Sequence, residues 1–255
     1  MAYDYKQRKK EIYKILHSKT DVLEKGNISD IEHETGGELT YSNGIKGYVT
    51  SIFVDIVNST GLFKEKKDKT VAKIIRIFAS EVIQILNDTQ LFKTIGVRGD
   101  CVFAVYATPT KNDINEVFNM SVEINTLRKM INKILNENDF PIINYGIGVG
   151  GSKDLVIKVG RKAIVNDLVF VGDAVINASN LANIASRNGI GPIAIDTFVY
   201  GNICKQETEG NQNFPKWFQK SKNQDLEYYH GDIIITKFNN WIEEECWWIK
   251  INSKN

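Results

Sequence analysis

Two aspartates, each placed where an expected strand meets a turn, are the residues in this sequence best suited to chemistry. Asp55 ends an apolar strand in the segment FVDIVNSTG at 53–61, and Asp100 lies in the hairpin segment RGDCVFAVY at 98–106. Either carboxylate alone is explained as well by a helix cap or a turn. Taken together, with strand patterns around both, they indicate a pair of hard oxygen ligands for Mg²⁺ or Mn²⁺ bound with a triphosphate.

The residues that follow Asp55 are suited to holding phosphate. Asn58, Ser59, Thr60 and Gly61 are small and polar, and a helix is expected just after them. Free backbone N–H groups at the start of a helix, together with the helix dipole, attract phosphate oxygens. Such a turn is a weak signal alone, and its position beside Asp55 gives it weight.

The elements that must position these residues alternate between strand and helix from Gly47 onward. β-Branched and alternating apolar residues predict strands at 48–57, 91–97, 101–107, 142–149, 155–159, 168–171 and 193–195. Apolar residues at helical spacing predict helices at 71–87, 114–135 and 174–187. The order strand, helix, strand, strand, helix, strand is the ferredoxin-like βαββαβ arrangement. We therefore expect an α+β fold, with a mixed or antiparallel sheet covered by helices and the two carboxylates at one end of neighbouring strands.

Composition and charge limit the function. The 255 residues carry 32 basic and 31 acidic side chains, so the overall charge gives no case for a nucleic-acid partner. No apolar stretch approaches the roughly 20 residues that span a bilayer, so no stable membrane span is expected. Three widely spaced cysteines, Cys101, Cys204 and Cys246, support neither a disulfide framework nor a zinc site. The expected protein is reduced and cytoplasmic.

Four segments in order resemble the class III nucleotidyl cyclase domain over about residues 48–200. They are FVDIVNST at 53–60, RGDCVFAVY at 98–106, NYGIGVGG at 144–151 and VGDAVINASNLA at 171–182. The resemblance implies a homodimer with active sites between two chains, in which the 3′-hydroxyl of a nucleoside triphosphate attacks its own α-phosphate. It implies two divalent ions, Mg²⁺ or Mn²⁺, held by Asp55, Asp100 and the carbonyl of Ile56. It also implies a cradle for the β- and γ-phosphates formed by Asn58, Ser59, Thr60, Gly61, Leu62 and Phe63.

The chain then divides into three expected parts. Residues 1–46, polar and helical at first with a thin apolar stripe, form an N-terminal extension. Residues 47–205 form the cyclase catalytic domain. Residues 206–255, polar and aromatic by turns, form a C-terminal extension that packs on the core.

The sequence departs from the family where purines are read. Four residues before the second metal aspartate the family has a base-reading lysine, and this chain has Gly96. Three residues before the glycine of the last motif the family has a polar base-reading residue, and this chain has Val169. Both usual purine contacts are missing, which argues against ATP and GTP.

The last motif departs as well. The family's asparagine and arginine registers hold Ile176 and Asn180, and Asn177 stands one place late. Asn177 and Asn180 are three residues apart and share a helical face, so we expect this pair to contact the substrate as the catalytic residues. Arg187, further along, is interpreted as a surface residue near the helix end.

These departures resemble the bacterial anti-phage pyrimidine cyclases of the Pycsar systems, which make cyclic UMP or cyclic CMP. The prediction is a phosphorus–oxygen lyase that converts UTP into cyclic UMP and pyrophosphate as a second messenger. Two alternatives stay open: a cytidylate cyclase, and a nucleotide-binding regulatory module that has lost catalysis. A palm-type polymerase or diguanylate cyclase relative is disfavoured by the neutral charge and by the absence of a GGDEF-like segment.

Two further residues are candidates for contact with the base or the phosphates. They are Tyr48, at the start of the first predicted strand, and Arg98, in the hairpin before Asp100. Core packing explains Tyr48 equally well, and a solvated turn explains Arg98 equally well.

Overall fold

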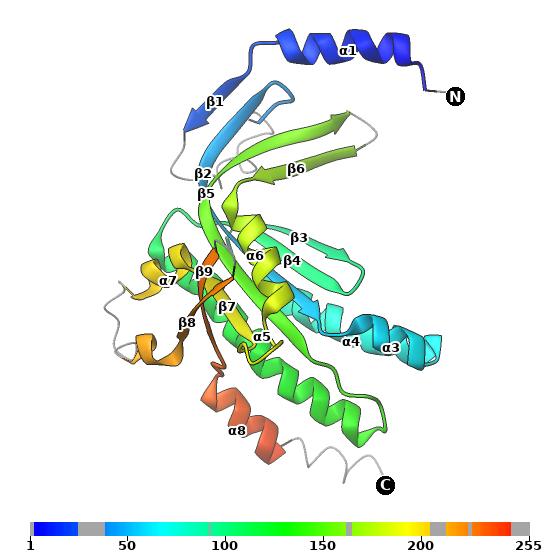
Figure 1. Ribbon diagram of the computed structural model, residues 1–255, viewed down its shortest axis with the longest axis vertical. Coiled ribbons are helices and arrows are strands. Elements are labelled where there is room, and N and C mark those ends of the chain that lie inside the picture. Colours follow the sequence, from blue (N-terminus) through cyan, green and yellow to red (C-terminus); the bar gives the residue numbers. More distant parts are fainter. Residues whose placement is uncertain are drawn as a thin grey trace.

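One sheet runs through the whole molecule, as the computed structural model shows for residues 3–24, 39–91, 93–161, 165–204, 213–223 and 226–245 (Figure 1). Within these ranges the sheet has nine strands in the order β3-β4-β2-β5-β7-β9-β8, with β1 paired to β2 and β6 paired to β5. The strands are β1 (Asp21–Glu24), β2 (Asn43–Ile56), β3 (Lys93–Arg98), β4 (Cys101–Ala107), β5 (Tyr145–Arg161), β6 (Val165–Val171), β7 (Ile193–Asp196), β8 (Gln219–Asn223) and β9 (Leu226–Gly231).

Helices cover both faces of this sheet. They are α1 (Tyr5–His17), α3 (Ser59–Glu65), α4 (Asp68–Asn87), α5 (Lys111–Glu137), α6 (Asp173–Ile184), α7 (Thr197–Cys204) and α8 (Thr236–Glu245), with a 3₁₀ turn at Phe214–Trp217. The long helices α4 and α5 lie on one face, and α6 lies alone across β5 on the other (Figure 1).

The α+β prediction is confirmed. The series β2-α4-β3-β4-α5-β5 builds the ferredoxin-like core, and its strands lie in the order β3-β4-β2-β5 with every pair antiparallel. The first and third strands of the core, β2 and β4, are neighbours, and Asp55 pairs with Cys101. Asp100 precedes Cys101, so the topology carries both aspartates to the same end of the sheet.

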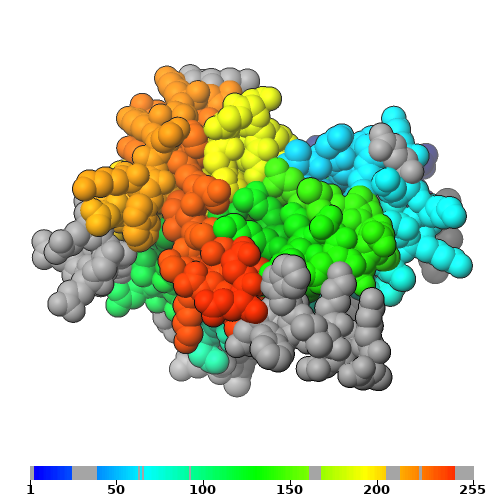
Figure 2. All heavy atoms as spheres, turned by 90° about the horizontal axis from the view of Figure 1, so that it is seen from below, coloured from blue at the N-terminus to red at the C-terminus, as the bar shows by residue number. Residues whose placement is uncertain are grey.

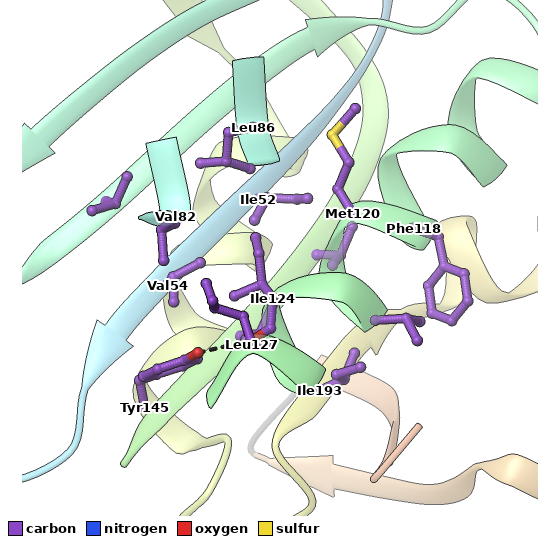
Figure 3. Close-up of a cluster of buried hydrophobic side chains, with 14 of the residues drawn as sticks. Ile52, Val54, Val82, Leu86, Phe118, Met120, Ile124, Leu127, Tyr145 and Ile193 are labelled. Carbon is purple, nitrogen blue, oxygen red and sulfur yellow. Dashed lines mark hydrogen bonds between the residues drawn. The ribbon is translucent and has the colours of Figure 1, made fainter. Parts of the chain in front are cut away.

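The main core lies between the sheet and the pair α4 and α5 (Figure 3). Two buried tyrosines anchor it: Tyr106 donates to the Leu86 carbonyl at 2.7 Å, and Tyr145 donates to the Ile124 carbonyl at 2.8 Å. Full burial of one large apolar side chain is worth about 1.5–3 kcal/mol, so this layer fixes how the strands sit. Alternate residues of β2 that enter it are Ile52, Val54 and Ile56.

On the opposite face, α6 rests directly on the backbone of β5. A Cβ added at Gly148 would lie 2.0 Å from the Ala178 carbonyl oxygen and 2.3 Å from the Ala182 nitrogen. A Cβ at Gly146 or Gly150, on the same face of β5, would lie 2.4 or 2.5 Å from a carbonyl oxygen of α6. The alternating glycines of the NYGIGVGG segment are therefore required by a helix that packs on the strand with no side chains between them.

Several predicted boundaries are wrong, for physical reasons. The strand predicted at 155–159 is the continuation of β5, because β2 starts at Asn43 and pairs along the extra length. The helix predicted at 174–187 ends at Ile184. The tail also adds two strands, β8 and β9, because β9 pairs with β7 in an antiparallel register.

The two ends of the described chain differ in how they pack. Helix α1 has no buried residue, so its apolar stripe is exposed. Helix α8 lies against α5 (Figure 2), where the Ile235 amide donates to the Thr126 hydroxyl at 2.9 Å and the Lys129 ammonium donates to Asn239 Oδ1 at 2.7 Å. Over the ranges given above, every helix is too short or too polar to cross a bilayer.

Candidate active site

A cleft of about 700 Å³ lies between the free face of the sheet and a wall made by β6 and α6. Side chains alternate along a strand, so the residues next to the buried Ile52 and Val54 point into this cleft. The sheet supplies Phe53, Asp55, Thr94, Arg98, Cys101, Phe103 and Val105. The facing wall includes Val169, Ile176, Ser179 and Asn180.

Asp55 and Asp100 interact electrostatically at one end of the cleft. Burial raises the pKa of Asp55 above its usual value, the charge of Asp100 raises it further, and Arg187 lowers it. Two carboxylates this close repel, and a bound cation removes that penalty. Electrostatically, the pair is a site for positive charge.

Cys101 adds a neutral thiol beside the two carboxylates. Burial, and then the charges of Asp55 and Asp100, raise the pKa of the Cys101 thiol to about 12. The thiolate is the nucleophilic form of cysteine, so without a bound cation the Cys101 thiol is neutral at neutral pH.

Arg187 is the site residue that the sequence interpretation missed, and its assignment to the surface is wrong. Its side chain is only 24% exposed, and Nη2 donates to Asp55 Oδ2 at 2.8 Å and to the Ile56 carbonyl at 3.4 Å. Nη1 donates to the carbonyls of Ala182 and Ala185 at 2.9 and 3.0 Å. Arg187 therefore ties the end of α6 to the two groups on β2 that were predicted as metal ligands.

The turn after α6 explains how Arg187 reaches the cleft. Ser186 and Asn188 adopt left-handed backbone conformations, with φ of 60° and 51°, on either side of it. The Ser186 hydroxyl also donates to the Tyr145 carbonyl at 2.8 Å, which fixes the turn on the sheet. Asparagine and glycine favour such conformations, so the Asn188-Gly189 pair was the available sequence signal.

The two asparagines on α6 do not act as a pair. Asn180 lines the cleft, together with Ile176 one turn earlier. The Asn177 amide instead donates to Asp196 Oδ2 at 3.2 Å, and Gly151 donates its backbone N–H to the same oxygen at 2.9 Å. The structure thus gives Asn177 a buried carboxylate as its partner and leaves Asn180 to line the cleft, and contact of either residue with the substrate stays a prediction.

The other candidate residues fall in different places. Arg98 lines the cleft. Tyr48 does not, since it is in register with the residues of β2 that face away from the cleft and it stacks on Phe198 with ring centroids 6.1 Å apart. Asn58 is the N-cap of the short helix α3 and has a left-handed backbone with φ of 56°. Residues 59–63 lie within α3, so the helix begins at Ser59 and not after Gly61 as expected. The side chain of Phe63 lies outside the described residues.

The donors at the carboxylate end fit a divalent cation that is also bound by its substrate. In the described part of the chain, no three His, Cys, Asp or Glu side chains gather as a metal site. Mg²⁺ commonly uses one or two protein carboxylates and completes its shell with water and substrate phosphates. Asp55, Asp100 and the Ile56 carbonyl provide such an incomplete set. Arg187 donates to Asp55 Oδ2 and to the Ile56 carbonyl, so a cation bound there would share these oxygens with the guanidinium or displace it.

Comparisons with known proteins bear on the family and the fold of the chain. No protein-family model matches the chain. It is 42% identical over 246 residues to a uridylate cyclase of Treponema porcinum, an alignment that covers 96% of this chain and 82% of that protein. It is 30% identical over 255 residues to a uridylate cyclase of Gulbenkiania mobilis, with 95% and 97% covered. In fold it resembles the crystal structure of the guanylyl cyclase Cya2, with a TM-score of 0.61 at 14% identity over 77% of this chain and 97% of that one.

Proposed function

The chain belongs to the uridylate cyclase family, and on that basis we propose that it converts UTP into 3′,5′-cyclic UMP and pyrophosphate in the cleft between the sheet and α6. One observation carries the proposal. The cleft joins Asp55, which interacts electrostatically with Asp100, to a largely apolar region lined by Val169. Val169 and Gly96 hold the two registers where purine cyclases read their base. Purine contacts are thus replaced, while the groups needed for phosphoryl transfer are retained.

The reaction is an intramolecular phosphoryl transfer. The ribose 3′-oxygen forms a bond to the α-phosphorus, the bond from that phosphorus to the oxygen bridging to the β-phosphate breaks, and pyrophosphate leaves with the electron pair. The hydroxyl proton passes to solvent. Two divalent ions bound by Asp55, Asp100 and the Ile56 carbonyl would acidify the hydroxyl and neutralise the leaving group.

The other residues of the site orient the Asp55 carboxylate and the substrate and balance their negative charges. Arg187 holds the Asp55 carboxylate in place and offsets its repulsion with Asp100. Arg98, in the cleft, offers a guanidinium that can pair with phosphate oxygens. Asn180 presents a neutral amide in the register of the family's arginine, and the segment Asn58–Phe63 would receive the β- and γ-phosphates, as the family resemblance implies.

We further propose a homodimer with two active sites at the interface, in which the cleft of each copy is completed by the other copy, as the family resemblance implies. The resemblance to anti-phage cyclases extends the proposal to synthesis of a second messenger in bacterial defence. Both points remain proposals, and both can be tested on the full chain by measuring its oligomeric state and the identity of its product.

A test with four nucleotides decides the substrate. The purified protein is incubated with ATP, GTP, CTP or UTP and Mn²⁺, and products are identified by mass. Cyclic UMP from UTP is expected as the main product. Cyclic CMP as the main product would favour the cytidylate cyclase, and no cyclic product from a dimeric preparation would overturn the enzyme proposal.

The asparagines of α6 provide a matched pair of variants. Asn180→Ala is expected to lower kcat on the order of a hundredfold with an unchanged melting temperature, since it removes a polar group from the cleft. Asn177→Ala is expected to lower the free energy of unfolding by about 1–2 kcal/mol, since it removes a donor from the buried Asp196 carboxylate, and to leave kcat within about threefold. Initial rates and thermal melts on both variants check this, and the reverse pattern would restore Asn177 to the active site.

A further inference from the structure

We propose that the ring of Phe103, backed by Phe53, limits the base end of the cleft to a single-ring base. This inference rests on the proposed cyclase function and names the residue that restricts its substrate to pyrimidines. The absence of a purine-reading side chain at position 96 is then only one cause of the specificity. The other is the Phe103 ring, which fills the space that such a side chain would occupy.

The two phenylalanines form a rigid unit on the cleft floor. Phe53 and Phe103 are paired across β2 and β4, and their rings stack with centroids 5.1 Å apart and planes 15° apart. Both line the cleft and both are partly exposed there. Stacked aromatic rings with few rotatable bonds hold their position better than a flexible chain does.

The Phe103 ring lies over Gly96, where any larger residue would point its side chain into the cleft. Gly96 pairs directly with Phe103 across β3 and β4. A Cβ added at Gly96 would lie 2.4 Å from Cζ and 2.7 Å from Cε1 of the Phe103 ring. Residue 96 must therefore be glycine as long as Phe103 keeps this position, and the ring occupies the space of a base-reading side chain.

The surroundings of the ring suit a small flat base. Val105 and Val169 line the same cleft with their apolar side chains. The Thr94 hydroxyl, two residues before Gly96 and so on the same face of β3, is a polar group in reach of this region. A hydroxyl both donates and accepts, so Thr94 can pair with the keto oxygen of uracil or the amino group of cytosine. Selection against purines is thus assigned to the limited space that Phe103 leaves for the base.

Phe103→Ala tests the size limit. We expect the ratio of kcat/KM for UTP to kcat/KM for ATP to fall at least tenfold, because removing the ring makes room for a second ring of the base. Phe103→Leu, which keeps apolar volume but removes the flat ring, is expected to move the ratio in the same direction by less. Phe198→Ala is the control, since it removes a partly buried phenylalanine that stacks on Tyr48, and it is expected to leave the ratio unchanged.

A second measurement does not depend on turnover. Gly96→Ala alone is expected to lower the melting temperature by about 5 °C or more, because its methyl group meets the Phe103 ring. In the Phe103→Ala background the same change is expected to lower it by less than half as much. Equal losses in both backgrounds would overturn the packing on which the inference rests.

The outcomes separate this inference from the proposed function. If the wild-type chain makes no cyclic UMP, the proposed function fails. If it does and folded Phe103→Ala and Phe103→Leu both keep the wild-type ratio, only the size limit is overturned. If Phe103→Ala folds but does not turn over, calorimetric affinities for UTP and ATP replace the rates, and an unchanged affinity ratio overturns the inference.

Discussion

Asp55→Asn is expected to reduce the formation of cyclic UMP on the order of a thousandfold or more. In the proposed reaction Asp55 provides one of the two carboxylates that hold the divalent ions, and the substitution keeps the shape of the side chain while removing its charge. Without that charge the site loses its ability to attract the cations that stabilise the transferring phosphate. We expect Asp100→Asn to have an effect of similar size.

The measurement must separate lost chemistry from lost folding. Asp55→Asn removes the ion pair with Arg187 but also removes the repulsion with Asp100, so the two effects on stability oppose each other. We therefore expect a thermal melt close to that of the wild-type chain. Asp88→Asn, an exposed carboxylate at the end of α4, is the matched control and should retain full activity. Full activity in a folded Asp55→Asn protein would refute the assignment of the carboxylate pair.

Gly148→Ala is expected to destabilise the protein by at least about 3 kcal/mol, or to prevent folding. The added methyl group would lie 2.0 Å from a carbonyl oxygen of α6, and that contact is with backbone, so no side chain can rotate to relieve it. The helix would have to move away from β5, which would displace Asn180 and Arg187 from the cleft. Activity is expected to fall together with stability.

Gly201→Ala is the matched control for this prediction. Gly201 lies within α7, and a Cβ there meets nothing within 4 Å. Replacing glycine by alanine inside a helix at such a position is expected to stabilise by about 0.5–1 kcal/mol. Denaturant melts of the two variants should therefore shift in opposite directions, and a tolerated Gly148→Ala would show that α6 does not rest on the strand backbone.

The features that the sequence predicts well are those set by local pattern. Strand periodicity placed Asp55 at the end of β2 and Asp100 in the β3–β4 hairpin, and the order of elements then fixed which strands are neighbours. Helix spacing found α4 and α5 because a buried stripe of apolar residues repeats along each of them. These patterns are properties of single segments, so they can be recognised from the sequence without knowledge of the fold.

The features that the sequence could not predict depend on contacts between distant segments. Arg187 reaches Asp55 only because two left-handed residues turn the chain after α6. Asn177 turns away from the cleft because Asp196, on another strand, engages its amide. Strand β8 carries polar, mostly exposed side chains, whereas β9 buries Tyr228 and His230, and both strands form because β9 pairs with the edge of β7. Helical spacing alone gave Asn177 and Asn180 equal standing.

The direct backbone contact between α6 and β5 has a mechanical consequence. No side chains lie between the backbones of α6 and β5, so the helix cannot slide or tilt on the strand. The two walls of the cleft therefore form one rigid body. In the proposed homodimer, opening for nucleotide entry and product release is then expected to come from the movement of whole chains relative to each other. We therefore expect the turnover rate to respond more to substitutions at the subunit interface than to substitutions that alter the flexibility of the cleft.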